Sequence, residues 1–557
     1  MPTTTTVRPR LKRYLWPMLG LMGTWVVLVA GMATTASTAP MTDEETGYMA
    51  RAIAWGLCAI AALTALAFAG HWAINGVRFG GATTAAGPVA PTIVGPEILD
   101  QADQATWSLE LRGVGIAPEI NHQSSVWRLI QEKRDNFTSV FSQDPQDYPD
   151  SSQGRGTSAS IRTGAAFEYA ATDSVAYWPI PAFVAEPPQR EPSAELRAAS
   201  LISNGRNKGS LGVTLFLWQQ DANTNHAQHL IEQLFNFMAE HAEVPQAMIA
   251  SRDGDVARNM YRPAGSPALP DGLYVPKVLD NTAVLMVSRS DRVDHHLRPR
   301  APEYRENNQD TKTDMGKLWA FYWKQSDLAY DEYDADTRAR RVIAPFYPGT
   351  MTSAYWQAAL PELWKTIDNR GPGQFTPTPW LPVRWTRHQV AEFDRAPKLG
   401  HLHRPVKVPL RDEQGKPLKP ALQAKALKAG WAQVLATLPP GHSPVRVFYD
   451  STDNQDSIIA LNTALHELNA DGHGLDPGNV DEGYDIGRRL GDTGLGSALV
   501  QIGLAAIASY KDGGVSAVMY AGEDGSVSLQ MVRPPSAEEK NHNAPYGEED
   551  PFMYRAR

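Results

Sequence analysis

Cysteine is almost absent from this sequence, because its 557 residues contain only Cys58. One thiol can form neither an intrachain disulfide nor a cluster of thiolate metal ligands, so both are excluded. Cys58 lies in an uncharged apolar stretch typical of a membrane span, and the rest of the chain has no thiol nucleophile. The lack of disulfides is compatible with the bacterial cytoplasm but does not establish the compartment.

Excess positive charge is also absent. The formal net charge is -9 at pH 7, and the sequence pI is about 5.9. Proteins that bind nucleic acid as their main partner need a basic surface to neutralise phosphates. The composition therefore argues against nucleic acid as a partner, although a local basic groove remains open.

Common signatures of hydrolases and nucleotide sites are missing as well. The Gly-x-Ser-x-Gly elbow of lipases does not occur, since the nearest match, at 514–517, continues with Val518. The metalloprotease pattern His-Glu-x-x-His is absent too. Gly491, Gly494 and Gly496 could cradle a phosphate before a helix, but they match neither nucleotide fingerprint. Tight backbone packing is the favoured interpretation of these glycines, and no cofactor is expected.

Possible metal ligands occur in three groups, which are His401 with His403, His295 with His296, and Asp450 with Asp453 and Asp456. The histidine pairs have no carboxylate at ligand spacing, so hydrogen-bonding or exposed histidines are favoured over a metal site. The aspartates follow a predicted strand and precede a predicted helix, where capping is the commoner role. No metal site and no catalytic residue is predicted.

The most informative stretch is residues 487–504, where a glycine-rich turn precedes an apolar helix. Asp492, Thr493 or Ser497 could cap this helix. Apolar residues cover most of its surface, which predicts that it is buried on all sides. Strand patterns follow at residues 515–520 and 526–532.

Two long uncharged apolar runs near the N-terminus predict a transmembrane helical hairpin, at residues 14–34 and 52–77. The tail at 1–13 carries four basic residues, whereas the loop at 35–51 is acidic until its last position, so the positive-inside rule places the tail and the C-terminal part in the cytoplasm. A cleaved signal peptide ending near residues 36–39 is the rival interpretation, and a buried apolar hairpin is the third. Residues 78–100 include a Gly- and Pro-punctuated linker.

The remaining chain predicts an α/β fold. A strand, an Asp-containing turn and an amphipathic helix occur in that order at 211–238 and again at 445–468, which suggests two related halves. We expect an N-terminal half at 101–255, a middle insertion at 256–420, a C-terminal half at 421–536 and an acidic, mobile tail at 537–557. Residues 177–183 contain two prolines and predict an edge strand or another extended segment.

The run Leu490-Gly491-Asp492-Thr493-Gly494, with the helix and strand pair after it, resembles the second half of a thiolase-like fold, as in ketoacyl synthases. That resemblance implies two related strand-helix halves, in agreement with the repeat. Thiolase-like enzymes use a cysteine at the N-terminus of a buried helix. This chain has no such thiol, so the resemblance implies a scaffold that is kept for binding.

A second resemblance covers most of residues 107–535. It is carried by Leu109 to Gly115, by Asp135-Asn136-Phe137 with Ser142 to Pro145 and Asp147-Tyr148-Pro149, by Leu211 to Leu215 with Asp221 to Thr224, and by Gly491 to Gly494. These stretches are similar to the type VI secretion lipase adaptor family. The resemblance implies a non-enzymatic adaptor that binds a phospholipase effector in the cytoplasm and helps load it onto the secretion spike. It assigns no binding residue to a position of this sequence.

The leading hypothesis is therefore an adaptor anchored in the bacterial inner membrane by two spans, with its soluble part in the cytoplasm. Two alternatives remain, namely an acyl-handling enzyme with a non-cysteine nucleophile and a structural or immunity-type membrane protein. Tryptophans of the middle region could anchor a partner or could belong to the core. These are Trp356, Trp364, Trp380 and Trp385.

Overall fold

The computed structural model describes residue 53 and residues 107–552, with gaps at 119–122, 134–137, 188–193, 225, 261, 263–264, 266, 304–309, 341–349, 453, 471–473, 523 and 544–549. The chain divides into two compact units, Met1–Val89 and Ala90–Arg557, and every element named below belongs to the second. No helix in the described residues is both long and apolar enough to cross a bilayer. The spans predicted at 14–34 and 52–77 lie outside the described residues, except for position 53.

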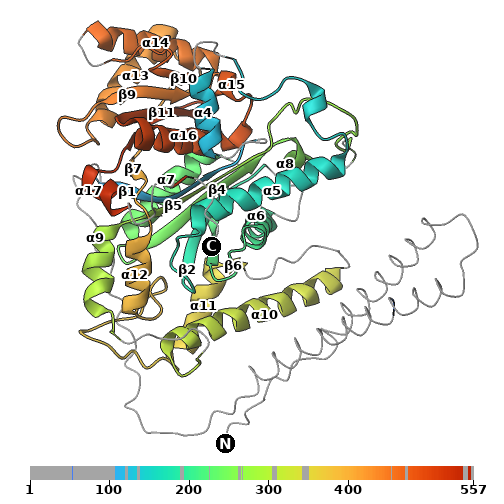
Figure 1. Ribbon diagram of the computed structural model, residues 1–557, viewed down its shortest axis with the longest axis vertical. Coiled ribbons are helices and arrows are strands. Elements are labelled where there is room, and N and C mark those ends of the chain that lie inside the picture. Colours follow the sequence, from blue (N-terminus) through green and yellow to red (C-terminus); the bar gives the residue numbers. More distant parts are fainter. Residues whose placement is uncertain are drawn as a thin grey trace, which may run out of the picture. The chain divides into compact units, whose positions relative to one another are not determined.

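The second unit is built from two halves with the same order of elements (Figure 1). The first half runs β1 (Ser108–Ile116), α5 (Ser152–Ala171), β2 (Pro179–Ala185), α6 (Ala194–Lys208), β3 (Leu215–Thr224), α7 (Ala227–Glu240), β4 (Gln246–Asp253) and β5 (Asn281–Ser288). The second half runs β7 (Gly400–His403), α13 (Pro420–Leu435), β9 (Pro444–Tyr449), α14 (Gln455–Ala470), β10 (Gly483–Asp485), α16 (Ser497–Asp512), β11 (Val515–Ala521) and β12 (Val527–Arg533). Short elements also precede or interrupt these, namely α4 (Gln123–Glu132), η2 (Pro145–Asp147), α8 (Asp255–Met260), β8 (Val406–Val408), α15 (Ile486–Arg489) and η5 (Gly494–Gly496).

Strand pairing confirms the duplication. The first half orders its strands β3-β2-β4-β5-β1, and the second orders them β10-β9-β11-β12-β7. In each half the first three strands are parallel and the last two alternate in direction. The halves join where β1 pairs antiparallel with β7, with Leu109 opposite Leu402. The two related halves expected from the sequence are therefore present in a mixed α/β fold.

The units compared in the sequence do not occupy equivalent places in the two halves. The unit at 211–238 forms β3 and α7, whose counterparts in the second half are β10 and α16. The unit at 445–468 forms β9 and α14, whose counterparts are β2 and α6. The interpretation of two halves holds, but the alignment of the repeats was wrong because every strand-helix unit has the same apolar pattern.

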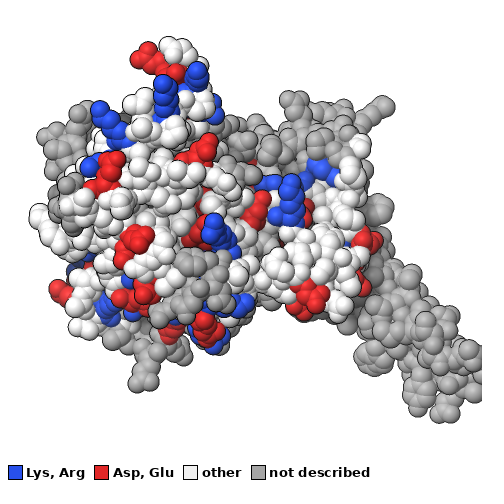
Figure 2. Space-filling view, turned by 90° about the horizontal axis from the view of Figure 1, so that it is seen from above, with Lys and Arg blue, Asp and Glu red and all other residues white. Residues whose placement is uncertain are grey.

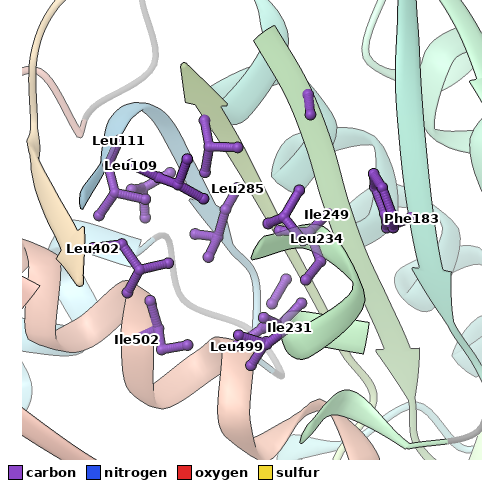
Figure 3. Packing of buried hydrophobic residues seen from close by; sticks show 14 of the residues in the cluster. Leu109, Leu111, Phe183, Ile231, Leu234, Ile249, Leu285, Leu402, Leu499 and Ile502 are labelled. Carbon is purple, nitrogen blue, oxygen red and sulfur yellow. The ribbon is translucent and has the colours of Figure 1, made fainter. Parts of the chain in front are cut away.

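Three apolar clusters define the layers. One lies between α5 and α6 and the first-half strands, and a second lies between α13 and α14 and the second-half strands. The largest lies on the inner faces, where α7 packs on β2, β3 and β4 and α16 contacts strands of both halves. Figure 3 shows part of this inner layer, with Leu499 of α16 on the side of Ile231 of α7 and Ile502 of α16 on the side of Leu402 of β7. The buried apolar helix expected after the glycine-rich turn is thus confirmed.

Strand β2 corrects the prediction of an edge strand at 177–183, because it lies between β3 and β4. Its prolines are tolerated for a local reason. Pro179 and Pro181 pair with β3, whereas pairing with β4 begins only at Ala182. The prolines therefore lie at the start of the strand, where the ladder has a partner on one side only.

The connection between the halves holds α9 (Ser290–Arg292), η3 (Val293–Leu297), η4 (Arg298–Arg300), α10 (Asp314–Arg340), β6 (Thr350–Thr352), α11 (Ser353–Trp364) and α12 (Arg387–Arg395). Both β5 and β7 lie within the predicted insertion 256–420, yet each pairs with β1 at the centre of the sheet. The connecting region proper is therefore narrower, at 289–399.

The four tryptophans of this region belong to the interior. Trp356, Trp380 and Trp385 are buried, and Trp364 is partly buried against the main core. Trp385 makes an edge contact with Trp178, with ring centroids 5.7 Å apart. The core interpretation of these side chains is confirmed, and none of them is an exposed anchor.

The segment after β12 is packed rather than mobile where it is described. Helix α17 (Ala537–His542) begins with a capping box formed by Ser536 and Glu539. Phe552 is fully buried, and its carbonyl accepts a hydrogen bond from Gln123 at 2.7 Å. The tail predicted to be mobile therefore contains two ordered segments, which are α17 and the segment at Phe552. The sequence pattern does not show the second, because Phe552 is a single apolar residue among acidic ones.

Candidate functional site

The glycine-rich turn lies where β4 ends and β5 begins. Gly494 has a φ of +57°, and a Cβ there would lie 2.0 Å from an Asp253 carboxylate oxygen. The backbone N–H of Leu495 donates to the same carboxylate at 2.9 Å, and that of Gly494 donates to Asp492 at 2.8 Å. These amides are used within the fold, so the tight-packing interpretation of the glycines is confirmed over a phosphate cradle.

The predicted cap of the following helix was wrong. The residue before α16 is Gly496, and it makes no side-chain cap. Asp492 instead closes the turn, and the hydroxyl of Ser497 donates to Asp450 at 2.5 Å. Helix α16 tolerates this because it is buried along its length, and packing rather than capping stabilises it.

Ion pairs surround the adjoining end of the sheet. Arg258 donates two hydrogen bonds to Asp253, at 2.8 and 2.7 Å, and this contact raises the pKa of the guanidinium. Arg252 donates to Glu186 at 2.6 Å, and both residues are buried. A guanidinium nitrogen of Arg162 lies 3.8 Å from an Asp280 oxygen. The charges at this end are therefore compensated in pairs.

A cavity of about 430 Å³ opens beside these pairs, between α5, α6 and α8 and the adjoining ends of β4 and β5. Its lining comprises Gly156, Ala159, Ser160, Arg162, Thr163, Ser200, Ser203, Asn204, Asn207, Arg252, Asp253, Val256, Ala257, Met260, Asp280, Asn281 and Thr282. The size falls in the range of ligand sites. Ligands of open α/β sheets commonly bind at the carboxyl ends of parallel strands, which is where this cavity lies. The sequence pattern gives no sign of this cavity, since its lining residues come from five elements.

The N-termini of the two inner helices carry no thiol. Helix α7 begins at Ala227 and α16 at Ser497. Ser497 donates to Asp450, which also accepts the Thr452 N–H at 2.8 Å, and burial raises the pKa of this aspartate. An activated serine needs a base that accepts its proton, usually an imidazole. These contacts close a turn instead, and neither is a bond to the first turn of α14, which is what the capping interpretation of Asp450 expects.

The two histidine pairs that were considered as metal ligands make other contacts in the structure. His401 contacts Glu539 at 3.1 Å, and His403 contacts the Thr437 carbonyl through Nδ1 at 2.7 Å. The rings of His295 and His296 lie edge to face. Within the described residues, no group of three or more His, Cys, Asp or Glu side chains could hold a metal ion. Hydrogen bonding is therefore the role that the structure shows for His401 and His403, while Asp453 lies outside the described residues and Asp456 is exposed in the first turn of α14.

Burial of His403 makes stability depend on pH. Its pKa is lowered to about 3, first by desolvation and then by Arg533. The unfolded chain takes up this proton near pH 6.5, so the stability that the neutral ring contributes is lost as the pH falls from 6.5 towards 3. We expect the unfolding free energy to lose about 2 kcal/mol between pH 7 and pH 5 from this residue. Urea titrations of the His403→Gln variant should show a smaller loss, whereas the exposed His466→Gln control should retain the wild-type slope.

Surface charge gives no second candidate site on the face that Figure 2 shows. On the described part of the face in Figure 2, acidic and basic side chains are interspersed, without a broad field of one sign. Such a surface offers no extended electrostatic footprint for nucleic acid.

Comparison with solved structures returns enzymes of the ketosynthase type. The oxazolomycin ketosynthase domain of Streptomyces albus is 10% identical, with a TM-score of 0.35, and the match covers 77% of this chain and 96% of that one. A fungal type III polyketide synthase is 9% identical with a TM-score of 0.36, and the match covers 77% of this chain and 100% of that one. FabH from Xanthomonas oryzae is 12% identical with a TM-score of 0.31, and the match covers 77% of this chain and 99% of that one. At these scores the matches carry no residue role, and the duplicated halves rest on the strand order itself.

Comparison with protein families is decisive. Residues 107–271 match the family described as type VI lipase adapter protein Tla3, N-terminal, and residues 399–534 match its C-terminal counterpart. The two matches together cover more than half of the chain, and each contains most of the strands of one half. The chain belongs to the type VI lipase adapter family.

Proposed function

We propose that this protein is a membrane-anchored adaptor that binds a type VI phospholipase effector in the cytoplasm and helps load it onto the secretion spike. The observation that carries the proposal is the pair of family matches, one on each half of the duplicated fold. The two apolar runs and the basic tail at 1–13 support an inner-membrane hairpin with the body on the cytoplasmic side.

A binding role, rather than catalysis, agrees with the chemistry of the body. The sequence after Cys58 contains no thiol, and Ser497 at the start of the most buried helix donates to a carboxylate instead of an imidazole. A ligand-sized cavity lies at the strand ends of the first half. The body therefore supplies a rigid scaffold with a concave site.

Affinity purification of the tagged full-length chain from membranes in mild detergent tests the proposal. We expect a type VI phospholipase effector and the spike protein to be recovered with it, because an adaptor must contact its cargo and its destination. Recovery of the chain from membranes without either protein would argue strongly against an adaptor. A chain found only in the soluble fraction would remove the anchor while leaving the adaptor role testable.

The alternative is an enzyme on this scaffold with a non-cysteine nucleophile. Ser497 is the candidate, because its hydroxyl lies at the start of α16 and donates to Asp450. Acyl transfer to a thioester probe by the purified chain, abolished in Ser497→Ala, would establish it. Protection against the lipase by this chain alone, without secretion, would instead indicate an immunity-type protein.

A further inference from the structure

The C-terminal segment Asp550–Phe552 occupies a site that the rest of the body builds for it. The Phe552 ring is 0% exposed and packs edge to face on Tyr510 of α16, with ring centroids 5.4 Å apart. The Phe552 carbonyl accepts a hydrogen bond from Gln123 at 2.7 Å, and the Phe552 N–H donates to the Asp550 carboxylate at 3.0 Å. The segment is therefore held by its backbone as well as by its ring, as a bound peptide is.

Gln123 joins this segment to two others. It is the first residue of α4, and it is 0% exposed. Its side-chain oxygen accepts the N–H of Ile116, the last residue of β1, at 2.9 Å, while its side-chain nitrogen donates to Phe552. Withdrawal of the segment takes away the acceptor of this nitrogen, and a buried donor without an acceptor is unfavourable. The segment therefore completes the hydrogen bonding that fixes the start of α4.

The last turn of α16 contacts both the segment and α4. Lys511 in this turn donates to the Asp550 carboxylate at 2.5 Å. The next residue, Asp512, accepts the indole N–H of Trp127, on α4, at 3.0 Å. Because the two contacts come from adjacent residues of one helical turn, a shift of the segment moves the turn that holds α4.

Helix α4 covers an apolar surface of the second half, although it follows β1 in the chain (Figure 1). It contacts α16, and the Trp127 ring centroid lies 5.2 Å from that of Tyr484 and 5.9 Å from that of Phe448. Val126 and Ile130 of the same helix are 0% exposed. Displacement of α4 would therefore uncover a patch of apolar and aromatic side chains, and such patches bind partners.

The segment is attached by few contacts. Among the described residues, one buried ring, one hydrogen bond and one ion pair attach it to the rest of the body. The side chains of Lys511 and Asp550 are 30% and 25% exposed, so their ion pair adds little stability. The two halves are joined separately, by the pairing of β1 with β7 and by α16. Chain ends with few buried contacts open at a lower free energy than the whole domain.

We propose that Asp550–Phe552 is a releasable latch. In its docked position it holds α4 against the second half. Its withdrawal loosens α4 and uncovers the surface around Trp127, Tyr484 and Phe448, while the rest of the fold stays closed. The inference goes beyond the proposed adaptor function and does not depend on it, because every contact that carries it lies within this chain.

Hydrogen exchange of the full-length chain in mild detergent tests the latch. Phe552→Ala removes the buried ring but keeps the backbone carbonyl that Gln123 contacts. We expect the amides of α4 to exchange about tenfold faster or more in this variant than in wild type, while those of β9 and β11 keep their wild-type rates. Phe393→Ala is the matched control, because Phe393 is also buried but lies on α12. This control should not accelerate exchange in α4 selectively.

A second variant changes the latch without altering the core. Lys511→Met removes the ion pair with Asp550 at a partly exposed position, so it reports on the latch even if Phe552→Ala does not fold. We expect it to accelerate exchange in α4 selectively, by less than Phe552→Ala does. If the latch opens as a unit, the double variant should exchange no faster in α4 than Phe552→Ala alone.

Three results would overturn the latch. The first is a wild-type exchange rate in α4 of both single variants. The second is acceleration of α4, β9 and β11 by the same factor, which would indicate a loss of stability throughout the body. The third is selective acceleration of α4 by Phe393→Ala, which would show that α4 responds to any cavity in the core.

Discussion

Replacement of Gly115 by alanine is expected to destabilise the protein by about 3–5 kcal/mol, a large part of the 5–15 kcal/mol that stabilises a typical domain. A Cβ on Gly115 would lie 1.8 Å from the Ala166 carbonyl oxygen, and a Cβ on Gly113 would lie 1.8 Å from that of Ala170. Helix α5 therefore packs directly on the backbone of β1. Because the obstructing atoms are main chain, the whole helix would have to move.

Urea unfolding of the full-length chain in mild detergent measures this effect. Gly156→Ala, in the helix that packs on Gly115, is the control, since a Cβ on Gly156 meets no atom within 4 Å. That variant should be as stable as wild type, or more stable by about 0.5–1 kcal/mol, because glycine weakens a helix interior. Equal midpoints for Gly115→Ala and wild type would show that the helix does not lie this close to the strand.

Replacement of Arg252 by methionine is expected to cost about 3–5 kcal/mol of unfolding free energy, because it removes a buried guanidinium from a buried carboxylate. Glu186 is 0% exposed, and Arg252 is 7% exposed. Their 2.6 Å hydrogen bond links the adjacent strand ends of β2 and β4 below the cavity. The loss arises mainly from the charge that remains behind, not from the strength of the pair itself.

A double-mutant cycle separates these two terms. Glu186→Gln removes the carboxylate charge, so the Arg252→Met, Glu186→Gln double variant should be more stable than Arg252→Met alone. The surface pair Lys365–Glu362, whose side chains are 62% and 66% exposed, gives a control cycle that should leave the stability close to that of wild type. Additive losses at positions 186 and 252 would show that the two residues do not interact in solution.

The ion pairs beside the cavity are satisfied within the fold. Arg252, Asp253 and Asp280 are satisfied by groups of the protein, so they shape the lining without attracting a charged ligand. The turn at 491–496 belongs to the second half and leads into α16. The backbone N–H of Leu495 in this turn donates to Asp253 of the first half, and the turn contacts β4. The family motif Gly491-Asp492-Thr493-Gly494 is therefore explained by packing between the halves, and it need not contact a partner.

Several elements could be predicted because their pattern is local. Strands β3, β9, β11 and β12 and helices α7, α14 and α16 follow runs of apolar residues with the expected period. Helix α5 was missed because Ser152–Ala171 is rich in Ser, Thr and Gly, which are weak helix formers. It forms because Ala166, Phe167 and Ala170 pack on the first-half strands.

The cavity could not be predicted for a related reason. Its lining residues come from positions between 156 and 282, and they are small or polar residues that would read singly as ordinary helix surface. The ion pair between Glu186 and Arg252 joins two strands that are adjacent only in the sheet. Neither feature has a signal at short sequence separation.

The sequence by itself determined the chemistry that this protein lacks, the α/β class, the buried helix after the glycine-rich turn and the family resemblance. Each of these depends on composition or on neighbouring residues. The tertiary structure decided the equivalence of the two halves, the central place of the proline-containing strand, the docking of Phe552 and the cavity between α5 and α6. These depend on which surfaces meet, and that is settled by packing between segments distant in the chain, which no local pattern encodes.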